Sequence, residues 1–158
     1  MTLYTIALWF YSILASLVFG ASVYETLVVH PAWSRQPPES LVGFVGAPIS
    51  RMNIGAFWKP VAPLFALSGL GALALAFRAG TQGAPLIASS TCAVLAVAWT
   101  LAYFRRSIVR FLDNGGGNTP ADRLRSDAQR WIRLNWIRTA MVAVAWWGAT
   151  LAAFTTRG

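Results

Sequence analysis

Charged side chains are scarce in this sequence. Of its 158 residues, 13 are Lys or Arg and 5 are Asp or Glu, so 11% are charged, against about a quarter in an ordinary soluble domain. Hydrophobic residues make up 56% of the chain. This balance excludes an ordinary water-soluble domain and predicts a membrane protein.

Cysteine, histidine and acidic residues are too few for several kinds of site. The single cysteine, Cys92, excludes an intrachain disulfide and a cysteine-built metal cluster. A dinuclear iron bundle is excluded because it needs two histidines at Glu-x-x-His spacing, and His30 is the only histidine. The sequence also contains no GxGxxG, GxxxxGKS/T or GxSxG motif, so it supports neither nucleotide binding nor serine hydrolysis.

Long apolar runs, by contrast, are plentiful. Four segments are long and apolar enough to span a hydrocarbon core, which needs about 20 residues. They cover residues 3–29, 56–77, 84–104 and 136–154. A signal peptide is a competing interpretation of the first, but that segment has no basic start and stays apolar too long. The prediction is an all-α integral membrane four-helix bundle, a single domain over residues 1–158.

Basic residues are distributed unevenly about these segments. The first and third loops, with adjoining helix ends, hold eleven of them, whereas the other side holds only Arg78 and Arg157. Because basic residues near span ends stay in the cytoplasm, this asymmetry predicts a cell-membrane protein with both termini outside the cytoplasm. The net charge of +8 is then explained by orientation and by contact with lipid headgroups. The lipid bilayer is therefore a predicted partner, and no pattern indicates nucleic-acid binding.

The two loops on the basic side carry local helix signals. In the first loop, Pro31 is expected to end the first helix, and residues 39–45 could form a short interfacial helix. In the second, Thr119 can cap a new helix and Pro120 suits its first position. Residues 120–154 would then form an uninterrupted helix of 35 residues, about 52 Å long. Because the hydrocarbon core is about 30 Å thick, this fourth helix is predicted to extend into the cytoplasm.

One face of the fourth helix carries the polar residues Asp127, Asn135 and Arg138 together with Trp131, at steps of four and three residues. An arginine as deep as Arg138 needs water or an anion. Glu25 is the only acidic residue in a span and lies at the same depth. We therefore predict a Glu25–Arg138 pair, which either links the first and fourth helices or lines a polar pocket.

His30 lies beside Pro31 at the end of the first segment and has two interpretations. It can cap the helix end or lie in the membrane interface, as a lone histidine usually does. It can also act as a general base or as a single metal ligand. The residues alone leave both interpretations open.

Two stretches of the sequence resemble a known family. They are FGASVYETLVVHPAWSRQPPESLVGFVGAPISRMNIGAFWKP, from residue 19, and LDNGGGNTPADRLRSDAQRWIRLNWIRTAMVAVA, from residue 112. Over nearly its whole length the chain is similar to the anthrone-oxygenase-like family of small four-helix membrane proteins. The most specific match is the run W-x-x-x-N-x-x-R-T, and the other matching positions are Pro31, Asn53, Asn114 and Asn118.

The resemblance implies a membrane-bound oxidoreductase, an oxygenase that acts with dioxygen on an anthrone-like, enolisable aromatic compound of the kind found in aromatic polyketide pathways. It implies a base, His30 or Glu25, and an oxyanion site formed by Asn135 and Arg138. The residues expected to bind the substrate are Tyr24, Trp33, Asn53 and Trp131. The cofactor is left open between none, a haem, and a copper or iron ion, for which His30 and Glu25 are the only plausible ligands.

Two other classes of protein stay open. A binding or transport protein would use the Glu25–Arg138 pair as a gated polar site, which in so small a bundle would require a homo-oligomer. An accessory subunit would present the same face to a partner helix. An enzyme, in contrast, has a small hydrophobic aromatic substrate as its predicted partner.

A cysteine introduced at Gly116, in the third loop, tests the orientation. We expect a membrane-impermeant thiol reagent to label it only from the cytoplasmic face, because eleven basic residues lie on that side against two on the other. Labelling from outside intact cells would overturn the assignment.

Overall fold

The computed structural model describes residues 2–46, 54–81, 83–107 and 119–155, and in these ranges all regular structure is helical. The elements are α1 (Leu3–Tyr24), η1 (Glu25–Val29), α2 (His30–Ser34), α3 (Glu39–Gly46), α4 (Ile54–Ala79), α5 (Ala84–Trp99), η3 (Thr100–Phe104) and α7 (Ala121–Thr155). The predicted all-α four-helix bundle is confirmed. Asn53, Asn114, Gly116 and Asn118, named above, lie outside the described residues.

Four helical stretches within the described ranges are long and apolar enough to cross a membrane, in agreement with the predicted segments. They are Leu3–Ser34, Ala56–Ala79, Ala84–Ser107 and Ala121–Thr155. The chain is thus a multi-pass membrane protein. The predicted interfacial helix at residues 39–45 corresponds to α3, and the predicted helix of 35 residues corresponds to α7, which has that length.

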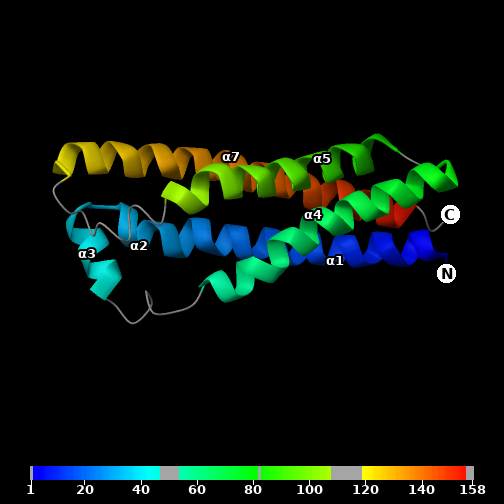
Figure 1. Cartoon of the computed structure of the whole chain (residues 1–158), viewed down its shortest axis with the longest axis horizontal. Coiled ribbons are helices and arrows are strands. Elements are labelled where there is room, and N and C mark those ends of the chain that lie inside the picture. Colours follow the sequence, from blue (N-terminus) through cyan, green and yellow to red (C-terminus); the bar gives the residue numbers. More distant parts are fainter. Residues whose placement is uncertain (1, 47–53, 82, 108–118, 156–158) are drawn as a thin grey trace.

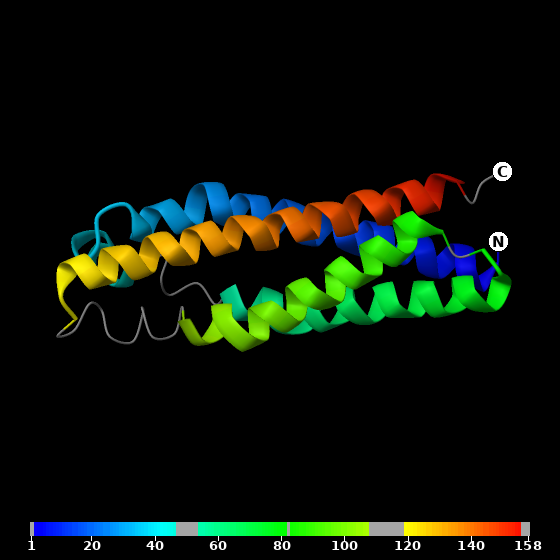
Figure 2. The ribbon, with the colours of Figure 1, turned by 90° about the horizontal axis from the view of Figure 1, so that it is seen from above.

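The long helices alternate in direction, so that α1 begins and α7 ends at the same end of the bundle (Figure 1). Helix α1 packs against α4 and α7, and α5 packs against the same two helices from the other side. The short helices α2 and α3 lie at the opposite end, where α7 projects past the end of α5 (Figures 1 and 2). The candidate site described below lies toward this second end of the bundle.

The first long helix does not end at Pro31, and that prediction is wrong. In η1 the backbone N–H of His30 donates to the carbonyl of Glu25, five residues earlier, so the turn is wider than an α-helical one. Pro31 then falls in the first turn of α2, where a missing N–H costs little. A second widened turn, η3, continues α5 in the same way. There the backbone N–H of Arg105 donates to the carbonyl of Thr100.

Small residues bring the helices close together in the middle of the bundle. Ser89, Ser90 and half-buried Cys92 of α5 lie in this region. The hydroxyl of Ser89 donates to the carbonyl of Ala145 on α7 and also contacts the hydroxyl of Tyr11. Gly148 of α7 faces the same part of α5 with no side chain between the two backbones.

The outer surface changes from apolar to basic at one level of the bundle. On three of the long helices an exposed apolar side chain is followed, a turn or more toward the α3 end, by an exposed arginine. The apolar members are Leu27, Leu101 and Ile137, and the basic ones are Arg35, Arg105 and Arg133. Since basic side chains are stable beside headgroups and costly in hydrocarbon, this change indicates the edge of the hydrocarbon core.

Replacing Gly148 with alanine tests the close approach of α5 and α7. A Cβ there would lie 2.5 Å from the carbonyl oxygen of Pro85 and 2.9 Å from the Cβ of Ser89. We expect a loss of about 1–3 kcal/mol in the free energy of unfolding, measured in detergent. Gly71→Ala is the matched control, because nothing lies within 4 Å of its added Cβ. Equal stability of the two variants would contradict the contact.

Candidate functional site

The polar stripe predicted on the fourth helix faces the inside of the bundle. Asn135 is fully buried, Arg138 is 8% exposed, and Trp131 is buried one turn further along. Asp127 does not share this face, because it is exposed and Ala128 occupies the buried position instead. An asparagine and an arginine are therefore tolerated at the start of a membrane-spanning segment because the protein, and not lipid, surrounds them.

Asn135 links His30 to Arg138. Its oxygen accepts a bond from Nε of Arg138 at 3.1 Å, and its Nδ2 lies 3.2 Å from Nδ1 of His30. Arginine nitrogens only donate, so the amide oxygen must face Arg138 and the amide nitrogen must face His30. Nδ1 of His30 is then the acceptor, which places the imidazole proton on Nε2. His30 is consequently held as a neutral ring that offers an N–H group.

Both widened turns supply partners for this network. Thr26 of η1 accepts a bond from Nδ2 of Asn135 at 2.9 Å, and its hydroxyl lies 3.2 Å from that of Thr139. Thr100 of η3 accepts a bond from Arg138 at 3.3 Å. Each of these two threonines donates its own proton to the main chain of the preceding turn. Widened turns of this kind occur frequently at functional sites, because they redirect side chains from the regular helical face.

Glu25 has a different partner from the one predicted. Its Oε1 accepts a bond from the indole Nε1 of Trp58 on α4 at 2.6 Å. The guanidinium of Arg138 is bonded to Asn135 and Thr100, so Glu25 and Arg138 influence each other only over a longer distance. The predicted pair is thus an electrostatic interaction and not a direct contact, because equal depth in the membrane does not define which faces of two helices meet.

An aromatic shell encloses one side of the network. Trp131 lies at its centre, with ring centroids 4.7 Å from His30, 5.2 Å from Trp33 and 5.2 Å from Phe104. The guanidinium carbon of Arg138 lies 5.1 Å from the centroid of the Phe104 ring, a cation–π distance. The indole N–H of Trp131 is buried and has no hydrogen-bond partner. A buried donor without an acceptor costs about 1–3 kcal/mol, so this group is poised for an acceptor.

The structure brings together five of the predicted site residues, places Glu25 within electrostatic range of one of them, Arg138, and separates Tyr24. His30, Trp33, Trp131, Asn135 and Arg138 form one contiguous cluster. Glu25 is hydrogen-bonded to Trp58. Tyr24 is 56% exposed on the outside of the bundle, so Tyr24 does not line the cluster. Asn53, the remaining predicted residue, lies outside the described part of the chain.

Sequence reasoning missed four members of the site: Thr26, Trp58, Thr100 and Phe104. Thr26 had a usable signal, since it precedes His30 by four residues and such residues share a helix face. The other three lie on the second and third spans, and their meeting with the first and fourth depends on the packing of the bundle.

The metal alternatives can be compared with the side chains present. Among the described residues, no three His, Cys, Asp or Glu side chains are grouped so that they could hold a metal ion. His30 also uses Nδ1 for Asn135, and Glu25 uses one oxygen for Trp58. The described residues therefore do not fit a metal centre built on this pair.

Comparison of the chain with protein-family models, with curated proteins and with solved structures gives no match.

Changing Trp58 tests the contact that holds Glu25. Trp58→Phe keeps a ring but removes the donor, so we expect a loss of about 1–3 kcal/mol in the free energy of unfolding in detergent. The loss should largely disappear in a Glu25→Ala background, because the two residues share one bond. Trp147→Phe is the control, since Trp147 is exposed on the outer surface. Additive effects of the Trp58 and Glu25 changes would argue against the contact.

Proposed function

We propose that the chain is a membrane-bound oxygenase that acts with dioxygen on a small, enolisable aromatic ketone of the anthrone type. The observation that carries the proposal is a pair of N–H donors in one buried aromatic cluster. Asn135 fixes His30 with its proton on Nε2, and the indole N–H of Trp131 has no acceptor. Donors held ready in a dry site stabilise the negative oxygen that develops when such a ketone is deprotonated.

The adjacent positive charge supports the same role. The guanidinium of Arg138 lies against the Phe104 ring and is bonded to Asn135, so its position is fixed. Its positive charge favours a negatively charged substrate oxygen in the cluster. Trp33, Trp131 and Phe104 provide the apolar, flat surfaces that a polycyclic aromatic compound requires. His30, Trp131 and Arg138 are thus assigned to the substrate oxygen.

The proton from the substrate carbon goes to Glu25 in this proposal. His30 cannot accept it at Nε2, which already carries a proton, and its Nδ1 is bonded to Asn135. Glu25 is the only acidic residue in the spans, and Trp58 holds one of its oxygens while the other is left for a proton.

The reaction balances with dioxygen as the only co-reactant. Loss of a proton from the CH₂ carbon of the substrate to Glu25 gives a carbanion, whose electron pair forms a C–O bond with O₂. The resulting peroxide takes up the proton and eliminates water, so that the carbon becomes a carbonyl group. One oxygen atom of O₂ enters the quinone and the other leaves as water.

Oxygen uptake by the purified protein in nanodiscs tests the proposal, with anthrone as the probe and anthraquinone absorbance as the second readout. We expect Asn135→Ala to lower the turnover rate on the order of a hundredfold, because His30 and Arg138 lose their positioning contact. Ser90→Ala is the control. It also removes one buried hydrogen bond, to the carbonyl of Gly69, but in the middle of the bundle, so its turnover should be close to that of the wild type.

Glu25→Gln separates the base from the donors. This variant should lose turnover at neutral pH and recover part of it as pH rises, because hydroxide can replace a missing base. His30→Ala should show no such recovery. A wild-type protein without oxygen uptake or anthraquinone formation would refute the oxygenase and leave the network as a lock between the first and fourth helices.

A further inference from the structure

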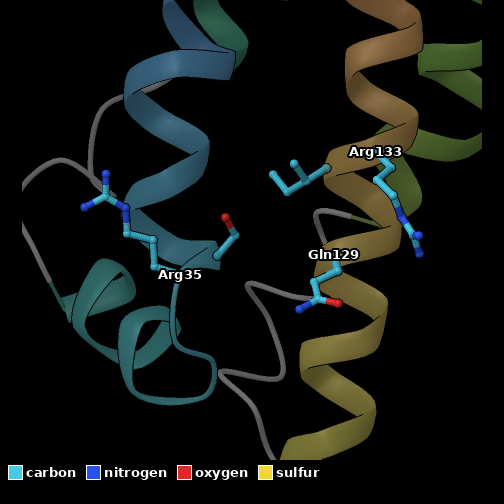
Figure 3. Close-up of a pocket in the computed structure, with 5 residues that line it drawn as sticks. Arg35, Gln129 and Arg133 are labelled. Atoms are coloured by element: carbon cyan, nitrogen blue, oxygen red, sulfur yellow. The ribbon is translucent and has the colours of Figure 1, made fainter.

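A groove opens between the end of α2 and the projecting part of α7. Its volume is about 420 Å³, and it is lined by Ser34, Arg35, Gln129, Ile132 and Arg133 (Figure 3). We propose that this groove binds the phosphate group of an anionic phospholipid. The inference is independent of the proposed oxygenase activity, because none of these five residues belongs to the site described above.

The lining has the chemistry of an anion site. One arginine comes from each wall, and none of the lining residues is acidic. Arginine presents a planar fork of N–H donors that matches a phosphate group, and the amide of Gln129 and the hydroxyl of Ser34 add neutral donors. Each wall of the groove therefore carries an arginine whose guanidinium would bind a tetrahedral anion after turning inward.

The two arginines point away from the groove and must turn to reach an anion in it. Figure 3 shows the guanidinium groups of Arg35 and Arg133 turned away from each other, with the amide of Gln129 in the space between the helices. Two like charges repel across an open groove, and both side chains are exposed and long enough to turn. A phosphate between them would remove that repulsion and draw both groups inward.

The level of the groove identifies the source of the phosphate. Ile137 is exposed and apolar, and Arg133, exposed and basic, lies four residues away, about 6 Å along the helix axis. The groove is therefore at the edge of the hydrocarbon core, where lipid phosphates lie. Its volume is also several times that of a small ion and falls in the usual range for small-molecule sites, about 300–1,000 Å³. Basic pockets between membrane helices at this level are typical sites for acidic headgroups.

Paired variants with equal charge test the inference. Arg35→Gln with Arg133→Gln removes both arginines of the groove. Arg105→Gln with Arg106→Gln removes two exposed arginines that follow η3 and do not line it. Native mass spectrometry of the full chain in non-ionic detergent would measure binding of phosphatidylglycerol, with phosphatidylcholine as the uncharged lipid. Thermal unfolding in the same detergent would show that both pairs fold.

We expect phosphatidylglycerol to bind the wild type in preference to phosphatidylcholine, and the groove pair to lose about thirtyfold in affinity. The control pair should lose less than about fivefold, since exposed charges away from the lipid are screened. Equal losses of affinity in the two double variants would mean that the basic surface attracts the lipid in general. That result would refute a binding site in the groove. Displacement of the lipid by millimolar inorganic phosphate would identify free phosphate as the ligand and overturn the lipid assignment.

Discussion

The side-chain amide of Asn135 bonds to the first helix through Thr26 and His30, and to Arg138 on its own helix. These atoms lie at a level where the outer surface is still apolar, so water is not at hand to replace a lost partner. In lipid the hydrophobic effect does little to bring helices together, and hydrogen bonds between helices help to select which faces meet. The contact of α1 with α7 at this end, the tautomer of His30 and the position of Arg138 all depend on this one amide.

The architecture could be predicted from the sequence because the length and apolar composition of each segment identify it as a membrane span. Length and hydropathy located the four membrane helices, and the Thr119–Pro120 start located α7 to within a residue or two. Helical spacing also placed Trp131, Asn135 and Arg138 on one face, which the structure confirms as buried. These features are local, since they follow from the period of a helix and the thickness of a bilayer.

The partners across the bundle could not be predicted in the same way. Depth matched Glu25 to Arg138, but charge and depth do not define which faces of two helices meet. Trp58 bonds to Glu25 because α4 packs against α1. The hydrophobic periodicity of each segment does not predict which helix lies beside it. The N–H of Trp131 is a similar case. Its lack of a partner depends on three surrounding aromatic rings, two from α2 and one from η3, and is visible only in three dimensions.

The widened turn η1 holds one residue more than an α-helical turn, as the bond from His30 to the carbonyl of Glu25 shows. If the same residues were wound as a regular α-helix, everything beyond this turn would be rotated by about 100° relative to the preceding span. His30 would then leave the face of Asn135, while the lipid-facing pattern of α1 would stay as it is. The widened turn therefore sets the rotation that places His30 in the polar cluster, independently of the apolar pattern that lets α1 lie in a membrane.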